Sequence, residues 1–302
     1  LTLDMSAAGA ATFNSTINGV GISSNITNFS ESMLISNDAG TGTLSSATNN
    51  TGFGFEVFDD LTSGVSNTAF GRKALTVNTT GGSNTAIGMN ALVANTTGSS
   101  NTAVGKSALT SNTTASNNTA VGFSALDTNT TGSQNVAIGY AALDANTTGG
   151  NNTAIGMSAL DANTTADSNT AVGYEGLTAN TTGFSNTVLG VQSMAANTTG
   201  NSNVAIGNSS LIAATVSDRQ VGIGVEALKN YNNTTAGDHY NVAIGYAAGR
   251  DTVDGLYNVF LGGLAGYDGD NGDNNVFVGY AAGQNNAASN NVGIGYQALD
   301  AN

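Results

Sequence analysis

The chain has 302 residues, of which 9% are charged, and it contains 41 glycines but no proline, cysteine or tryptophan. Without cysteine, neither disulfides nor thiolate metal sites can form. The net charge is −14, and the six basic residues are too scattered to neutralise a phosphate backbone, so no nucleic-acid partner is expected. The sequence contains no run of about eighteen apolar residues, so we expect no insertion into a membrane.

Residues 1–49 carry no clean repeat, and we expect them to form an adaptor. Small, polar and apolar residues alternate in their first half, as in strands joined by glycine turns, although a flexible linker is the alternative. The segment 32–36 is a candidate degenerate repeat unit, anchored at Ser32, slightly more than one period before Asn50. Because the chain starts with neither methionine nor a basic region followed by an apolar one, we expect a fragment or a processed product.

Residues 50–219 form a series of repeats with the same spacing throughout. The anchoring asparagines are Asn50, Asn67, Asn84, Asn101, Asn118, Asn135, Asn152, Asn169, Asn186 and Asn203. A fixed short period is the sequence signature of a solenoid or fibre. We call each unit a rung and number its positions from the asparagine as position 1. The period predicts an all-β fold, a parallel β-roll or β-solenoid of about 17-residue rungs stacked about 4.8 Å apart.

Two columns of bulky apolar residues are the candidate core. In rung 84–100 they are Ile87 at position 4 and Leu92 at position 9, and the other rungs carry similar residues. We expect position 4 to form one inward wall and position 9 the facing wall, each on its own short strand, so that a rung has two strands. Gly88 at position 5 is expected at a corner that requires an unusual φ.

Small residues suggest where another chain packs. Positions 3 and 8 are mostly alanine, as at Ala86 and Ala91, so they fall on faces from which large side chains are excluded. If the chain itself does not seal that face, identical copies would cover it, which predicts an intertwined or side-by-side homotrimer. The Asn-Thr-Thr-Gly segment, at 95–98 in this rung, is expected to form a polar outer turn with Asn and Gly in left-handed conformations.

Residues 220–302 are predicted to form modified rungs with an insertion. From Gln220 to Asn241 the spacing grows to 21 residues, and an insertion in a solenoid forms a loop on one face. On this loop, Tyr231, His239 and Tyr240 are the candidate surface-contact residues for a sugar or a protein, because flat amphipathic rings suit such surfaces. The alternative is that His239 is a solvated loop residue without a role.

After residue 241 the repeat resumes with different side chains. Position 9 becomes glycine, and aromatic residues appear at several places, including Phe260 and Phe277 at position 3. Periodicity leaves open whether these two rings fill a widened core or line an exposed groove.

No cofactor, metal site or catalytic group is predicted. His239 is the only histidine, and no nucleophile elbow or paired-carboxylate environment stands out, so an enzyme is not expected. The acidic run 268–273 suggests calcium, but it lacks the closing glutamate of an EF-hand, and a solvated loop is favoured. Asp127, Asp144 and Asp161 share position 10, where like charges repel, so this column is expected at an outer surface.

Asn-Thr-Thr also matches the N-glycosylation sequon eight times, from Asn78 to Asn197. Turn chemistry accounts for these residues without a glycan, and stacked rungs would crowd glycans placed on every unit.

A resemblance to known fibres rests on the motif N-x-A-I-G-x-x-A, present at 135–142 and 241–248. It resembles the head repeats of trimeric autotransporter adhesins and is similar to repeats in phage tail fibres. The opening LTLDMSAAGAATF looks like the segment before the shaft or tip of tail fibres that carry a self-cleaving C-terminal chaperone, which would then be removed or lie beyond residue 302. The resemblance implies a left-handed parallel β-roll over roughly 50–302, with three chains side by side. The adhesin unit is shorter than the unit of this chain, which is a departure.

We therefore expect a structural and adhesive fibre protein, a trimeric shaft of a phage tail fibre that contributes to receptor binding at a host surface. Its partners would be itself and a cell-surface receptor such as a glycan or an outer-membrane protein, and its place extracellular, on a virion tail or a cell surface. A bacterial surface adhesin or extracellular filament with the same fold is the nearest alternative. An ice-binding solenoid that uses threonine columns is an alternative of another class, and a polysaccharide-cleaving tailspike is less favoured.

Overall fold

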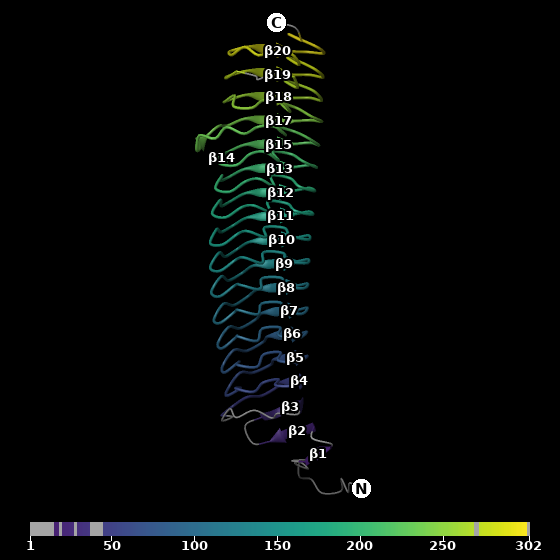
Figure 1. The fold of residues 1–302 in the computed structure, drawn as a ribbon, viewed down its shortest axis with the longest axis vertical. Helices are drawn as coiled ribbons and strands as arrows, with labels where there is room; N and C mark the ends of the chain where they lie inside the picture. Colours follow the sequence, from purple (N-terminus) through teal and green to yellow (C-terminus); the bar gives the residue numbers. More distant parts are fainter. Residues whose placement is uncertain (1–14, 18–19, 27–28, 37–44, 269–271, 301–302) are drawn as a thin grey trace. The chain divides into compact units, whose positions relative to one another are not determined.

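A computed structural model describes residues 15–17, 20–26, 29–36, 45–268 and 272–300. By its internal contacts the chain divides into two compact units, an N-terminal unit of residues 1–134 and a C-terminal unit of residues 135–302. In the residues that the structure describes, all regular structure is β-strand, and no helix is present that could cross a membrane. Both units contain a stack of short parallel strands, one above another (Figure 1).

The N-terminal unit begins with three antiparallel strands. β1 (Ser15–Ile17) pairs with β2 (Val20–Ile26), and β2 pairs with β3 (Phe29–Ser36). β3 then pairs in parallel with β4 (Thr51–Phe53), with Met33 opposite Thr51. This register is the one that a degenerate rung anchored at Ser32 predicts. The change from antiparallel to parallel pairing therefore falls where the repeat begins.

The rungs that follow have one three-residue strand each, at positions 2 to 4. In the N-terminal unit the strands after β4 are β5 (Thr68–Phe70), β6 (Thr85–Ile87), β7 (Thr102–Val104) and β8 (Thr119–Val121). In the C-terminal unit they are β9 (Val136–Ile138), β10 (Thr153–Ile155), β11 (Thr170–Val172), β12 (Thr187–Leu189), β13 (Val204–Ile206), β15 (Val221–Ile223), β17 (Val242–Ile244), β18 (Val259–Leu261), β19 (Val276–Val278) and β20 (Val292–Ile294). Equivalent positions pair directly, as Ala86 does with Ala103. The predicted parallel β-solenoid is thus confirmed.

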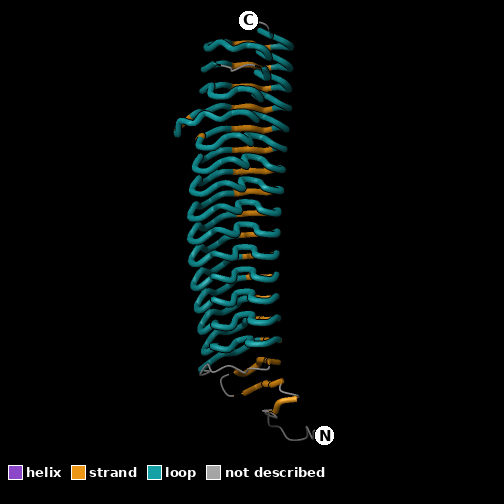
Figure 2. Tube along the Cα trace, viewed as in Figure 1, coloured by secondary structure: helices purple, strands orange, loops and turns teal. Residues whose placement is uncertain are grey.

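The expectation of two strands per rung is wrong. Apart from two short strands beside the insertion, the rungs consist of turns and loops outside positions 2 to 4, as the short orange segments of Figure 2 show. In rung 84–100 the backbone has φ of 132° at Gly88, 62° at Asn90 and 52° at Leu92. Alternating positive φ values cannot continue a strand, so the chain turns twice after position 4. These turns still bond from rung to rung, for example Leu92 N to the Ala108 carbonyl at 3.1 Å.

The inward side of the strand is position 3, not position 4 as the sequence predicted. Ala86 is fully buried, whereas Ile87 next to it is 39% exposed. Because side chains alternate along a strand, burying positions 1 and 3 forces positions 2 and 4 outward. Leu92 at position 9 is buried as expected, and in most rungs a small residue, usually alanine, accompanies it at position 3. The expectation that the alanine face is unsealed by its own chain is therefore also wrong, since Ala91 is fully buried too.

Buried asparagines hold successive rungs together. The backbone N–H of Asn101 donates to Asn84 Oδ1 at 2.9 Å, and its side-chain amide donates to the Ala115 carbonyl at 2.8 Å. A second column of asparagines, at position 12, also forms hydrogen bonds between rungs, with Asn112 Nδ2 donating to Asn95 Oδ1 at 2.8 Å. Asn95 was expected in an outer turn with a left-handed backbone, but its side chain points inward and its φ is not positive. The interior therefore combines apolar side chains with buried amides, and most of these amides have a hydrogen-bond partner.

The aromatic rungs carry a large buried residue at position 3 and a small one at position 9. Phe260 and Phe277 are fully buried at position 3 and stack with ring centroids 5.8 Å apart. A Cβ added to Gly266, which replaces leucine at position 9, would lie 2.7 Å from the Phe260 ring. A large residue at position 3 therefore requires a small one at position 9, and the question left open by the sequence is decided in favour of a core role.

Replacing Gly245, a position 5 glycine, with alanine should destabilise the C-terminal unit by several kcal/mol. The φ of Gly245 is 139°, a region nearly restricted to glycine, and an added Cβ would lie 2.5 Å from the Gly262 carbonyl oxygen of the next rung. Urea unfolding followed by circular dichroism measures the loss. Gly237→Ala is the control, because Gly237 has a φ of 144° but nothing within 4 Å of the added atom, so only about 1–3 kcal/mol of backbone strain is expected. Equal losses in the two variants would show that close approach between rungs does not matter.

Candidate interaction surfaces

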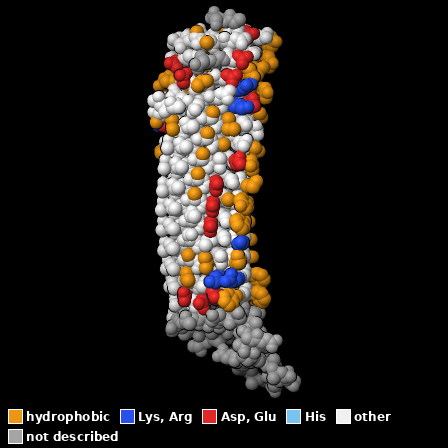
Figure 3. Space-filling view, viewed as in Figure 1, with side chains coloured by type: hydrophobic (Ala, Val, Ile, Leu, Met, Phe, Trp, Pro, Cys, Tyr) orange, Lys and Arg blue, Asp and Glu red, His pale blue; other side chains and the backbone are white. Residues whose placement is uncertain are grey.

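Each unit carries two neighbouring columns of exposed apolar side chains, at positions 4 and 6, separated by the glycine at position 5. We call them together the apolar stripe (Figure 3). In the N-terminal unit its exposed members are Phe53, Phe55, Phe70, Ile87 and Phe123. In the C-terminal unit they are Ile138, Tyr140, Ile155, Met157, Tyr174, Leu189, Val191, Val225, Tyr246, Leu261, Tyr280, Ile294 and Tyr296. A row of large exposed apolar residues is unusual on a soluble monomer and marks a contact surface.

Stacking makes the stripe regular. Phe53 and Phe70 lie parallel with centroids 5.0 Å apart, and Tyr280 and Tyr296 lie 5.8 Å apart. Cations cover single rings, as Lys106 does over Phe123 at 5.3 Å. The stripe therefore presents preordered rings, which lose little side-chain entropy on contact with a partner.

Threonines flank the stripe at position 2. Thr85, Thr102 and Thr119 pair in register on successive strands and are half-buried. From Val204 onward the same position is valine, so the outer face of the strands is more apolar toward the C-terminal rungs.

The insertion forms a small sheet at the side of the C-terminal unit. β14 (Ser217–Asp218) pairs in parallel with β16 (Gly237–Asp238). Of the three predicted contact residues, the structure places only Tyr240 on the surface. Tyr231 is fully buried and His239 is 3% exposed, and their rings meet edge to face at 5.8 Å. Tyr231 occupies position 12, where most other rungs bury asparagine, which is why its ring points inward.

Tyr240 stands in a ladder that the sequence analysis missed. Its ring stacks on Tyr257 at 6.1 Å, and the Arg219 guanidinium lies over it at 5.7 Å. Its hydroxyl donates to Asp238 Oδ2 at 3.1 Å, and Asp238 also pairs with Arg219. The signal was available, because Arg219, Tyr240 and Tyr257 each come directly before an anchor of the repeat. Arg219 and Tyr257 cover the two faces of the Tyr240 ring, so a partner could contact only the ring edge and the hydroxyl group.

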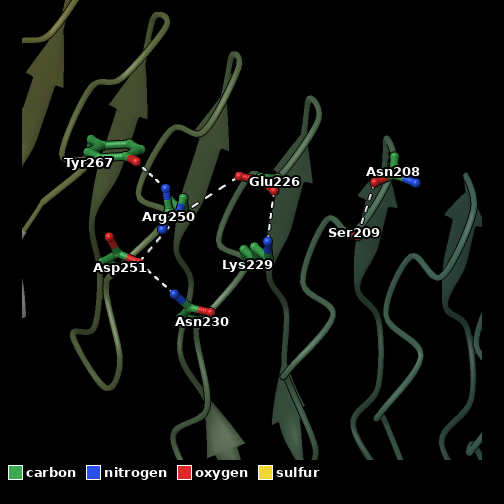
Figure 4. A network of polar contacts seen from close by, with 8 residues as sticks. All are labelled: Asn208, Ser209, Glu226, Lys229, Asn230, Arg250, Asp251 and Tyr267. Atoms are coloured by element: carbon green, nitrogen blue, oxygen red, sulfur yellow. Dashed lines mark hydrogen bonds and ion pairs between the residues drawn. The ribbon is translucent and has the colours of Figure 1, made fainter.

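A polar network ties the modified rungs together (Figure 4). Arg250 pairs with Glu226 and Asp251 and donates to the Tyr267 hydroxyl, which joins three successive rungs. Lys229 donates to Glu226 at 2.7 Å, and this hydrogen bond holds the pKa of the Glu226 carboxyl below its usual value. The network joins the rungs on either side of the insertion. Its charged side chains pair with one another, so their clustering does not indicate a ligand site.

The remaining candidates from the sequence carry no site. The eight sequon asparagines are fully buried and cannot accept a glycan in the folded chain. Asp127, Asp144 and Asp161 are half-buried at the surface, and burial raises the pKa of Asp161. The acidic run 268–273 includes residues 269–271, which lie outside the described residues, so the calcium hypothesis is untested. Within the described ranges no cluster of His, Asp or Glu is arranged to hold a metal.

Comparisons with models of protein families, with curated proteins and with solved structures find no match to this chain.

The buried His239 should make the insertion sensitive to acid. Burial lowers the pKa of His239 below 6.5, despite opposing effects of the Thr235 backbone and the Asp218 charge. Between 6.5 and this lower value the unfolded chain takes up a proton that the folded chain does not. Stability should therefore be complete above pH 6.5 and fall as pH decreases, as measured by urea midpoints at pH 7.5 and 5.5.

His239→Phe is the matched variant, because it keeps an aromatic ring against Tyr231 and removes the titration. All carboxylates titrate in both proteins, so the difference between their pH profiles isolates His239. Identical profiles for the two proteins would contradict the prediction.

Proposed function

We propose that this chain is the shaft of an extracellular, homotrimeric fibre that contributes to adhesion at a host surface, as in a phage tail fibre. The observation that carries the proposal is the apolar stripe. Exposed isoleucine, leucine, phenylalanine and tyrosine recur at positions 4 and 6 from rung to rung in both units. A monomer would leave this surface in water at a cost of about 25 cal/mol for each Å².

A second copy of the chain is the partner best suited to the stripe. Side chains that repeat once per rung, about 4.8 Å apart, are matched along their length only by a partner with the same spacing. Rotation about an axis parallel to the rung stack keeps like rungs together and closes the assembly. The choice of three copies rests on the resemblance of N-x-A-I-G-x-x-A to the repeats of trimeric adhesins, not on the alanine columns, which are sealed within the chain.

Adhesion is proposed because a stack of rungs holds other surfaces at a distance and three copies present each of them three times, which raises avidity. The receptor would be a glycan or an outer-membrane protein. A bacterial surface adhesin or an extracellular filament with this fold would have the same stripe, and electron microscopy of the native assembly distinguishes a particle from a cell surface.

Light scattering should give a mass about three times the 29.9 kDa of one chain. Ile155→Lys should convert the assembly to monomers, because three ammonium groups would be buried together without partners. Thr148→Lys, an exposed position 14 residue away from the stripe, should leave the trimer intact. A compact wild-type monomer would refute the proposal.

An ice-binding protein is the second candidate, favoured by the in-register threonines at position 2 beside apolar residues at position 4. The two candidates exclude each other, because the same outer face of the strands cannot be buried between copies and meet ice. Thermal hysteresis measured on the wild-type protein should be absent if the stripe is an interface. Hysteresis that Thr102→Lys abolishes would instead establish the ice-binding function.

A further inference from the structure

A shallow depression of about 210 Å³ lies on the C-terminal unit, between the ends of two successive rungs. Its lining includes an aromatic ring, four hydroxyl groups and one carboxylate. These belong to Phe184, Thr165, Ser168, Thr182, Ser185 and Asp167. Pockets for drug-sized ligands measure roughly 300–1,000 Å³, so this one has room for a single small ring.

Phe184 interrupts a hydrogen-bond ladder at position 16. In neighbouring rungs the side chain at this position accepts the backbone N–H of the rung before, as Asp167 Oδ1 does from Gly150 and Asn201 Oδ1 does from Phe184. Serines do the same in the N-terminal unit, where Ser116 Oγ accepts from Ser99. A phenylalanine cannot accept, so the Asp167 N–H has no acceptor in the next rung. It is a free donor beside the depression.

The Phe184 ring is available as well. It is 51% exposed, and among the described residues no other ring and no cation lies against it. This distinguishes it from Phe123, Tyr240 and the stacked rings of the stripe. The Phe184 ring therefore places hydrophobic surface in solvent and forms no hydrogen bond to the neighbouring rungs.

We propose that the Phe184 depression binds one ring of a neutral sugar. A sugar has an apolar C–H face that packs on an aromatic ring and a rim of hydroxyls that both donate and accept. The Asp167 N–H and the hydroxyls of Thr182 and Ser185 can bond that rim, and the free Asp167 oxygen can accept from it. None of the lining residues is cationic, and the Asp167 carboxylate repels anions, so acidic sugars are excluded. The site rests on the proposed adhesive function only in taking the sugar to be part of a surface glycan.

Phe184→Trp gives a direct reporter, because the chain has no other tryptophan. Titration with the methyl glycosides of glucose, galactose, mannose and N-acetylglucosamine should shift its fluorescence saturably with at least one of them, in the millimolar range. Saturation-transfer NMR should detect the same glycoside on the wild-type protein. Glucuronic acid should bind at least tenfold more weakly. Absence of a saturable response to all four neutral probes, or preference for the acid, would overturn the site.

Phe184→Ser is the decisive variant. It removes the ring and restores the residue type that completes the ladder, so the fold should be at least as stable while sugar binding is lost. Val65→Ala, which shortens an exposed apolar side chain at the same position of another rung, should bind as the wild type does. Unchanged binding in Phe184→Ser would refute the site. Light scattering on the same samples keeps the two proposals apart, since a monomer that binds sugar would refute only the trimer.

Discussion

The spacing between rungs is the constraint on which the rest of this structure depends. Within each unit, backbone bonds join each rung to the next not only along the three-residue strands but also through the turns, so equivalent positions stand above one another. A side chain must therefore tolerate its own copies as neighbours. Asparagine satisfies this condition in the interior because its amide both donates and accepts, and two buried columns, at Asn84 and Asn95 in one rung, use it in this way.

Departures from the repeat are compensated in the rung where they occur or in a rung next to it. Phenylalanine at position 3 is accompanied by glycine at position 9, and Tyr231 fills the space of an asparagine where the preceding rung has only Ala214. The insertion that follows Tyr231 emerges at the side, and Arg250 bonds across the rungs around it. A buried position can thus carry a different residue where nearby residues restore the packing and the polar pairing. Residues on the outer surface can vary more widely.

Much of the fold could be predicted from the period, because a strict short repeat allows few arrangements. The corner glycines and the buried leucines such as Leu92 followed from residue type. The side of the strand that points inward could not be predicted from residue type. Ala86 and Ile87 recur with equal regularity, and the larger residue is the more hydrophobic. Packing against Leu92 decides which of the two residues is buried. That packing depends on the whole folded rung and cannot be read from one repeat position alone.

On the candidate surfaces, too, the sequence did not predict which side chains are exposed. Aromatic rings on the inserted segment were expected to face solvent, yet Tyr231 and His239 are buried because the solenoid interior continues beneath the insertion. Arg219 and Tyr257 lie outside the insertion and were not predicted as contact residues, although they flank Tyr240. Phe184 departs visibly from the polar residues of its column, but only the structure shows that those residues accept a backbone N–H from the rung before.

The asparagine columns also bear on how the molecule ages. Asparagine is among the thermolabile residues, since its side chain can lose ammonia and leave a carboxylate. In the folded chain the anchoring amides are buried and held by neighbouring rungs, so this reaction requires a rung to open. Each event would then place a negative charge inside the stack and loosen the rungs above and below. Slow accumulation of acidic forms on storage would therefore record how often individual rungs open.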